Sequence, residues 1–217
     1  MKTLPSWLID HTDNFDADSI HHAHIISGRD GVGKDLLAVY LAKLILCLGK
    51  EKGHCGNCQS CNLTDDINHP DLSKLEVLPD KKLIGISQII DLRRKLYESS
   101  FLGKNKVAII PDLEKISLDG LNAILKILEE PPENTYFLLT TSFLNQIPLT
   151  IQSRCFDIKI VTPDESVTLE WLKDYPKQDS LKALSLTNNR PLLAKEFLEK
   201  KILHKRQEFI YEISIII

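Results

Sequence analysis

The stretch Ile25-Ile26-Ser27-Gly28-Arg29-Asp30-Gly31-Val32-Gly33-Lys34 decides the fold of this chain. It begins in a brief apolar strand, Ala23 to Ile26, and a helical pattern of apolar residues follows from Leu36 to Ile45. Strand, glycine turn and helix in this order are the context of a phosphate-binding loop. Glycines let backbone N–H groups turn inward, the helix N-terminus adds partial positive charge, and the lysine can reach terminal phosphates. We expect an α/β domain whose loop uses Gly28, Gly31, Gly33 and Lys34.

The residue after Lys34 departs from a working nucleotide site. The pattern requires Ser or Thr there, whose hydroxyl holds Mg²⁺, but this chain has Asp35. A carboxylate at that place would lie close to the phosphates and repel them. The alternative is an acid that complements the dipole at a helix N-terminus. We therefore expect a loop with the right shape that binds ATP and Mg²⁺ weakly or not at all.

A second departure follows the apolar strand Lys106 to Ile110. P-loop proteins place a carboxylate beside Mg²⁺ at such a strand end, usually as two adjacent acids. Here Leu113 separates Asp112 from Glu114. We expect the two acidic side chains at this strand end to point opposite ways, which would leave one of the two roles unfilled.

A further buried strand, Tyr136 to Thr141, ends in hydroxyls. Thr141 could touch a γ-phosphate, or it could be a strand-end threonine satisfied within the chain, and the sequence leaves both interpretations open.

Four cysteines cluster after the first helix. Cys47 is followed by Cys55, Cys58 and Cys61, the last three spaced Cys-x₂-Cys-x₂-Cys. Four thiolates can close a tetrahedral zinc site, and four sulfur ligands leave no open coordination position, so the predicted Zn²⁺ is structural. The alternative is a group of reduced structural thiols. His54 and His69 lie nearby and are expected at the surface.

The bulk properties exclude several classes of protein. The 217 residues are 43% apolar and 26% charged, which is ordinary for a globular protein. A net charge of −3 argues against a chain that coats nucleic acid by itself. No apolar run approaches the roughly 20 residues that span a bilayer, and the start lacks a secretory h-region. We expect a cytoplasmic protein without a membrane segment.

Apolar periodicity predicts the remaining elements. They are a lead-in helix over Trp7–Ile20, a strand over Leu72–Leu78, a helix over Ile86–Tyr97, a helix from the N-cap Ser117 to Glu130, a short helix over Ile147–Gln152, a last strand over Phe156–Ile160, and three short helices near 163–174, 178–187 and 191–201. The predicted buried faces are Ile86, Ile89, Ile90, Leu92, Leu96 and Tyr97 on one helix and Leu118, Leu121, Ile124, Leu125 and Leu128 on the next.

A proline followed by acids at Val161–Glu165 marks a domain boundary. We expect one domain over residues 1–162, with the cysteine module at 47–61 inserted in it, and a small helical lid domain over 163–217. The terminal stretch Tyr211–Ile217 is apolar without a polar stop and reads as an element cut short.

Two motifs complete the pattern: Leu121-Asn122-Ala123-Ile124-Leu125-Lys126-Ile127-Leu128-Glu129-Glu130-Pro131-Pro132 and Ser153-Arg154-Cys155. Together with the altered loop and the cysteine module, they make Trp7 to about Lys200 resemble bacterial clamp-loader subunits of the AAA+ class. The resemblance implies a Rossmann-like parallel sheet with a P-loop, an inserted zinc module and a helical lid. It implies a component of DNA polymerase III, a DNA-directed DNA polymerase, with gamma/tau and delta subunits as partners and the sliding clamp and primed DNA reached through the complex.

Within that family the departures favour the delta-prime branch. Gamma/tau subunits carry Ser or Thr at the position of Asp35 and paired acids at 112 and 113, and this chain has neither. An active gamma/tau-type ATPase remains the alternative, and a zinc-ribbon interaction module is a weaker third. The family also has a C-terminal collar domain, which would lie beyond the end of this sequence.

The resemblance implies that Arg154 is an arginine finger, which acts in trans on a neighbouring subunit's nucleotide, with Cys155 as a buried core thiol. A guanidinium can grip phosphate oxygens in two places and offset transition-state charge. Without the resemblance, a surface arginine in a salt bridge would be the default interpretation. Arg190 is ambiguously placed for a nucleotide sensor and is not counted as one.

Overall fold

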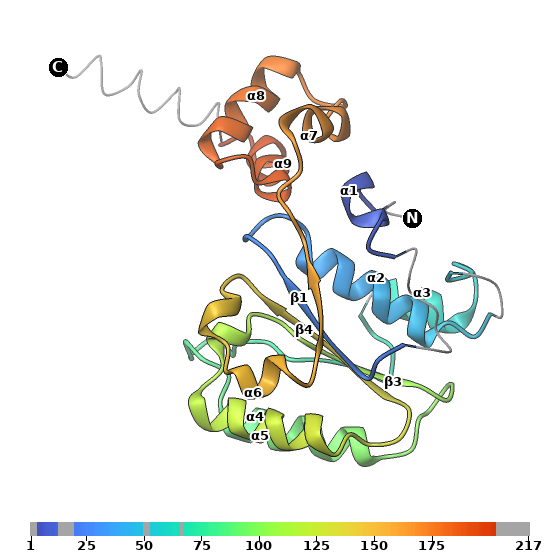
Figure 1. Cartoon of the computed structure of the whole chain (residues 1–217). Coiled ribbons are helices and arrows are strands. Elements are labelled where there is room, and N and C mark those ends of the chain that lie inside the picture. The colour runs from blue at the N-terminus through green and yellow to red at the C-terminus, as the bar shows by residue number, and fades with distance from the viewer. Residues whose placement is uncertain (1–3, 13–19, 50–52, 66, 203–217) are drawn as a thin grey trace.

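The protein is built around a five-stranded parallel sheet with strand order β2-β3-β4-β1-β5 (Figure 1). The structure, a computed structural model, describes residues 4–12, 20–49, 53–65 and 67–202. β1 lies between β4 and β5. Because every strand pair is parallel, all strands end at the same edge of the sheet, and the turn after β1 emerges there. In open α/β sheets, ligands bind at that edge.

The strands are β1 (Ala23–Ser27), β2 (Leu72–Lys74), β3 (Lys106–Ile110), β4 (Thr135–Thr141) and β5 (Phe156–Lys159). The α-helices are α1 (Ser6–Ile9), α2 (Lys34–Leu46), α3 (Gln59–Asp65), α4 (Ile86–Tyr97), α5 (Leu118–Glu129), α6 (Leu149–Gln152), α7 (Glu165–Trp171), α8 (Lys177–Leu186) and α9 (Pro191–Glu199), and the short 3₁₀ helices are η1 (Leu113–Lys115) and η2 (Leu144–Gln146).

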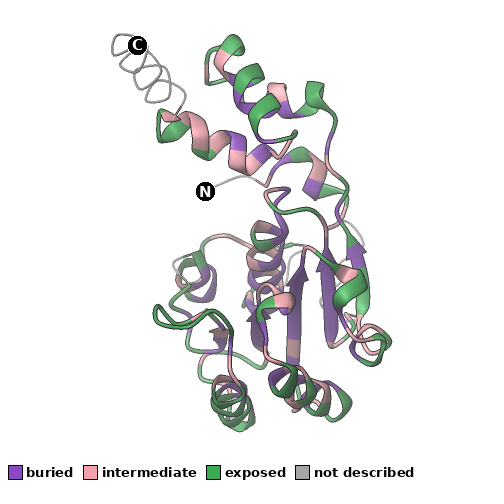
Figure 2. Ribbon diagram, turned by 90° about the vertical axis from the view of Figure 1, so that its left-hand side faces the viewer, coloured by how far each residue is buried: buried purple, intermediate pink, exposed green. Residues whose placement is uncertain are grey.

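Each face of the sheet has its own core. Neighbouring residues of β1 point to opposite faces: Ile25 packs with α4 and α5, whereas Ile26 packs with α2. Because helices cover both faces, the inner strands β1, β3 and β4 are buried along most of their length rather than on alternate residues, as Figure 2 shows for the sheet interior. The continuous apolar runs of the sequence reflect this double cover.

Several predicted elements are shorter in the structure, most clearly the lead-in helix and the strand over Leu72–Leu78. The lead-in helix spans Ser6–Ile9, and residues 13–19 of the predicted span lie outside the described residues. The predicted strand Leu72–Leu78 was too long, because β2 ends at Lys74. Beyond it, the carbonyl oxygen of Glu76 accepts a hydrogen bond from the Gln88 side chain instead of joining a strand.

The predicted buried faces of α4 and α5 were partly wrong. On α4, Ile89, Leu92 and Leu96 are buried, but Ile86, Ile90 and Tyr97 are exposed. The three buried residues form one stripe at helical spacing, and the exposed ones lie on the flank of that stripe. On α5, Leu118 is exposed because it occupies the first turn, beyond the edge of the core, while Ile124 and Leu128 are buried as predicted. Ser117 caps α5 as predicted, accepting a hydrogen bond from the Gly120 amide at 3.2 Å.

Helices α7, α8 and α9 form a separate small cluster above the carboxyl edge of the sheet (Figure 1). Their apolar contacts centre on Leu172, Ala183, Leu184 and Ala194. The three helices agree in order with the predicted ones. The division of the chain at residue 162 stays a prediction, and the stretch Tyr211–Ile217 lies outside the described residues.

Candidate functional site

The glycine turn after β1 has the shape that the sequence predicts. Gly33 adopts φ 111° at the start of α2, a backbone conformation that side chains rarely tolerate. Space is short as well, because a Cβ on Gly28 would lie 2.8 Å from the carbonyl oxygen of Ile160. The turn therefore needs glycine at both positions, for backbone geometry at one and for close packing at the other.

Lys34 is turned into the protein and is only 5% exposed. Its Nζ donates to the hydroxyl oxygen of Ser142 at 2.9 Å and to the carbonyl oxygen of Arg29 at 3.3 Å. Both acceptors belong to the same edge of the sheet, one after β4 and one in the turn itself. The ammonium group thus bridges the turn and the end of β4 without a carboxylate at hydrogen-bonding distance.

The two acids after β3 have different partners. Asp112 has φ 46° and pairs with Lys115 at 2.7 Å, and this hydrogen bond and charge raise the pKa of Lys115. Glu114 instead accepts hydrogen bonds from the Thr141 hydroxyl at 2.8 Å and from the Ser142 amide at 3.0 Å. Asp112 and Glu114 therefore point to different partners, as the sequence predicts. The cause is not the alternation of side chains along a strand but the turn into η1, which buries Leu113 completely.

The hydroxyls at the end of β4 are satisfied within the chain. Thr141 donates to Glu114 and accepts from the Phe143 amide at 3.1 Å. Thr140 donates to Asp35 at 3.3 Å and accepts from the Asp112 amide at 3.1 Å. At this edge of the sheet, the carboxylates of Asp35 and Glu114 therefore already accept hydrogen bonds from Thr140 and Thr141.

Helix α1 and the C-terminal helices contact the outer side of the glycine turn. The indole of Trp7 donates to the carbonyl oxygen of Val32 at 2.9 Å, and its ring meets the ring of Trp171 at 5.3 Å between centroids. From α9, the Leu192 amide donates to the carbonyl oxygen of Gly31 at 3.0 Å. Arg190 lies 3.8 Å from Asp30. The glycine turn is therefore held by hydrogen bonds from α1 and from α9.

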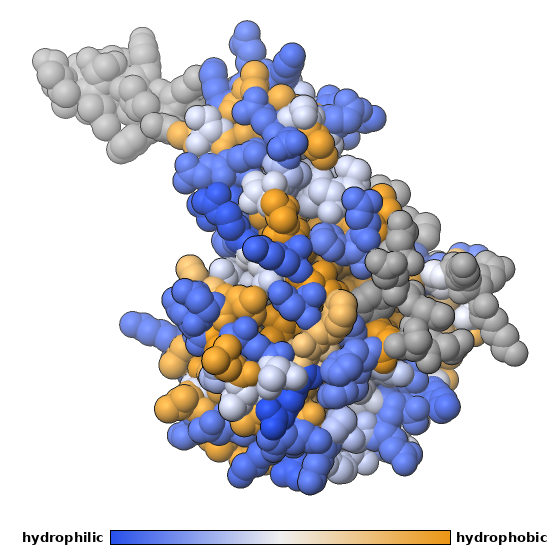
Figure 3. Space-filling view, in the orientation of Figure 1, coloured by the Kyte–Doolittle hydropathy of each residue, from blue (hydrophilic) through white to orange (hydrophobic). Residues whose placement is uncertain are grey.

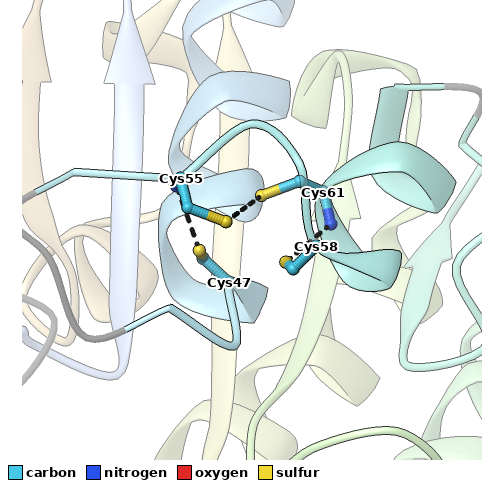
Figure 4. Close-up of side chains that lie close together, drawn as sticks. All are labelled: Cys47, Cys55, Cys58 and Cys61. Carbon is cyan, nitrogen blue, oxygen red and sulfur yellow. Dashed lines mark hydrogen bonds between the residues drawn. The ribbon is translucent and has the colours of Figure 1, made fainter.

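The four predicted cysteine ligands converge. Cys47 follows α2, Cys55 and Cys58 lie in the next loop, and Cys61 is in α3, and their sulfur atoms all lie within 4.8 Å of one another (Figure 4). A tetrahedral Zn²⁺ with Zn–S bonds of about 2.3 Å requires sulfur atoms about 3.8 Å apart. The Sγ atoms of Cys55 and Cys61 are 4.0 Å apart. The donor set fits a metal ion of this kind.

Backbone amides prepare the sulfur atoms for a cation. The amide of Cys55 donates to the sulfur of Cys47 at 3.3 Å, and that of Cys61 donates to the sulfur of Cys58 at 3.4 Å. Burial by itself would raise the pKa of the Cys58 thiol, but hydrogen bonds from the Cys61 and Leu48 backbones and from neighbouring thiols lower it to about 6. Burial raises the pKa of Cys61. A bound cation would favour thiolate at all four.

The prediction that His69 lies at the surface was wrong. His69 is 3% exposed; its Nδ1 accepts from the Asp71 amide at 3.0 Å, and its Nε2 lies 2.8 Å from the Ser60 hydroxyl. Ser60 in turn donates to the carbonyl oxygen of Leu46. Burial lowers the pKa of His69, which fits a neutral ring with the proton on Nε2. This chain of contacts ties α3 to the end of α2 behind the cysteines. The proline after His69 had suggested only a chain break.

Arg154 follows α6 and lies at the surface, with 35% of its side chain exposed. Its Nη1 donates to the carbonyl oxygen of Thr150 at 2.7 Å, and its Nη2 lies 2.7 Å from Oε1 of Glu129, at the end of α5. Next to it, Cys155 packs against the core but is only partly buried, since β5 is an edge strand. Burial raises the pKa of the Cys155 thiol to about 12. Cys155 therefore favours the neutral thiol, and it is not part of the group of four converging cysteines.

None of the helices within the described part of the chain is long and apolar enough to cross a bilayer. The parallel strand order, the glycine turn after β1 and the helices on both faces give the chain the fold of AAA+ P-loop proteins. The chain belongs to the family described as "DNA polymerase III, delta subunit", whose model matches residues 6–164.

Named relatives agree with this assignment. The DNA polymerase III subunit delta' of Haemophilus influenzae is 35% identical over 97% of this chain and 66% of its own length. That of Buchnera aphidicola subsp. Schizaphis graminum is 33% identical over 89% of this chain and 60% of its own length. The chain thus spans less than two thirds of each relative. A gamma subunit-related protein of Thermotoga maritima shares the fold, with a TM-score of 0.55 and 20% identity over 90% of this chain and 72% of its own.

Proposed function

We propose that this chain is a delta-prime-type subunit of a bacterial clamp loader. In this role it acts in DNA replication by completing the ATP site of a neighbouring gamma/tau-type subunit, and so helps to load the sliding clamp onto primed DNA. The observation that carries the proposal is a contrast within the chain: Asp35 and Glu114 near the glycine turn are engaged in internal hydrogen bonds, whereas Arg154 lies partly exposed at the surface after α6.

The internal hydrogen bonds beside the glycine turn support weak or absent nucleotide binding. Two carboxylates beside the glycine turn and the end of β4, Asp35 and Glu114, already accept hydrogen bonds from strand-end threonines. Lys34 is likewise occupied. A nucleotide would have to break this network and approach like charges. In this proposal the C-terminal helices, from residue 163 onward, act as a lid that stays on the glycine turn.

The surface around Arg154 has the character of a subunit interface. Leu149 in α6, Phe156 in β5 and Val161 after it are all strongly exposed. Figure 3 shows apolar surface gathered on this side of the molecule, below the C-terminal helices. Exposed apolar surface of this kind marks protein–protein contacts. A neighbouring subunit that covered it would bring its nucleotide close to the guanidinium.

The proposed partners are the gamma/tau and delta subunits, with the sliding clamp and primed DNA reached through the assembled complex in the cytoplasm. The net charge of −3 agrees with a subunit that leaves most DNA contact to others. We further propose that the metal ion held by the four cysteines is Zn²⁺. Its role is structural, because it would tie the short loop around Cys55 and Cys58 to helices on either side.

Reconstitution tests this function directly. Adding the chain to purified gamma/tau and delta subunits, with sliding clamp and primed DNA, is expected to raise DNA-stimulated ATP turnover well above that of the incomplete mixture. The physical reason is that one ATP site lacks its trans-acting cation until the chain binds. Stable binding without any change in turnover at every ATP concentration would contradict the proposal.

The alternative, an active gamma/tau-type ATPase, is separated by the nucleotide affinity of the isolated chain. We expect a Kd for Mg²⁺–ATP of about 1 mM or weaker and no turnover, measured by calorimetry and phosphate release. Asp35→Thr removes the like charge and is expected to strengthen binding about five- to tenfold. Micromolar affinity with turnover in the unaltered chain would favour the alternative.

A further inference from the structure

The contact between Arg154 and Glu129 joins the two motifs that the sequence singled out. Glu129 is the last residue of α5, and α6, which leads to Arg154, packs beside that helix (Figure 1). Oε1 of Glu129 lies 2.7 Å from Nη2 of Arg154, while Nη1 is held by the Thr150 carbonyl oxygen. The guanidinium is therefore held at both terminal nitrogens, on the surface that the neighbouring subunit would cover.

The position of Glu129 is unfavourable for α5 itself. The C-terminal end of a helix carries partial negative charge, so a carboxylate there is destabilising unless a cation compensates it. Arg154 is the cation that the structure places on it. Replacing Glu129 by glutamine removes both the repulsion from the helix end and the attraction to Arg154, so these two effects on folding oppose each other.

The ion pair between Glu129 and Arg154 is weak enough to be displaced by a phosphate. Glu129 is 43% exposed and Arg154 35% exposed, and ion pairs with this much solvent access are weak. The terminal phosphate of a nucleotide carries more charge than one carboxylate and can accept two parallel N–H bonds from a guanidinium. A phosphate brought to this surface would compete successfully for the arginine.

We propose that Glu129 is a positioning residue that holds Arg154 in reserve and yields it to the terminal phosphate of ATP on the neighbouring subunit. This inference rests on the proposed function, since it needs a neighbour whose nucleotide reaches Arg154. It adds an acid from this chain to that site: the arginine stays neutralised and oriented until a phosphate is present. ATP must then displace a carboxylate before it gains its cation.

The first test uses the chain alone and does not depend on assembly. Phenylglyoxal modifies free guanidinium groups, and the rate at Arg154 can be followed by mass spectrometry of its peptide. We expect Glu129→Gln to speed this modification about two- to fivefold, the range of a partly exposed ion pair. Glu130→Gln is the matched control, because it removes the same charge one residue further on, and no described cation pairs with Glu130. Equal rates in the two variants would overturn the proposal.

The second test uses the complex with gamma/tau and delta subunits. Glu129→Gln is expected to lower the KM for ATP about two- to fivefold with little change in kcat, because losing the pair from the nucleotide-free state favours the bound state and the transition state equally. Glu130→Gln should leave both constants unchanged. If Glu129→Gln matches Glu130→Gln while Arg154→Ala lowers turnover, the reserve role fails and the proposed function stands. If Arg154→Ala changes nothing, the proposed function itself fails.

Discussion

Replacing Arg154 by alanine is expected to leave the chain folded and able to join the complex, yet to reduce ATP hydrolysis at the site it completes by about three orders of magnitude or more. In the proposed role the loss is large because the guanidinium offsets charge that develops on the transferred phosphate. Total turnover should fall to what the remaining ATP sites sustain. Single-turnover phosphate release from the reconstituted complex measures the effect.

Arg94→Ala is the matched control for this experiment. Arg94 is also an arginine in an ion pair, 3.5 Å from Asp91, but both residues belong to α4 and not to the Ser153–Cys155 motif. Its removal should leave turnover unchanged. Arg154→Lys should fall between alanine and the native chain, because it keeps the charge but loses the planar fork. Equal turnover for Arg154→Ala and Arg94→Ala would show that Arg154 is a surface ion-pair residue and nothing more.

Removing the metal is expected to have the second largest effect. We expect the purified chain to contain one equivalent of zinc, and Cys61→Ser to contain close to none, because the remaining three sulfur atoms cannot close a tetrahedral site. Structural zinc contributes about 10–16 kcal/mol of apparent binding free energy in zinc-finger peptides, so its loss should unfold the loop from Gly53 to Cys61. Zinc content by atomic spectroscopy and amide hydrogen exchange over this loop measure the two consequences.

Cys155→Ser provides the control for metal binding. Cys155 is the one cysteine outside the cluster, and it packs against the core beside Arg154. The serine variant should keep a full equivalent of zinc even if its stability changes. A Cys61→Ser protein that still held one equivalent with unchanged affinity would contradict the four-sulfur site.

The sequence was most informative where backbone geometry leaves few choices. Apolar runs predicted the strands, glycine and lysine spacing predicted the turn after β1, and Cys-x₂-Cys-x₂-Cys predicted the sulfur cluster, since each pattern reflects a local requirement. The boundaries of β2 and the exposure of Leu118 were wrong, because they depend on which neighbouring residues happen to cover an element.

Contacts between distant residues were harder to predict. No local sequence pattern indicates that the ring of His69 contacts Ser60. Likewise, none indicates that Glu129 pairs with Arg154, 25 residues later. The role of Leu113 could not be predicted either. In the sequence it stands where a second acid is usual, whereas in the structure it is buried in the core beneath the turn that directs Glu114 to Thr141. These pairings arise from the fold as a whole.

The edge-to-face contact between Trp7 and Trp171 has a practical consequence. The protein contains two tryptophans, and they are these two, one before the sheet in the chain and one after it. All indole emission of this chain therefore originates where α1 meets the C-terminal helices. This chain therefore carries its own optical probe of that junction, so separation of α7 from α1 can be followed in the isolated chain without attaching a dye.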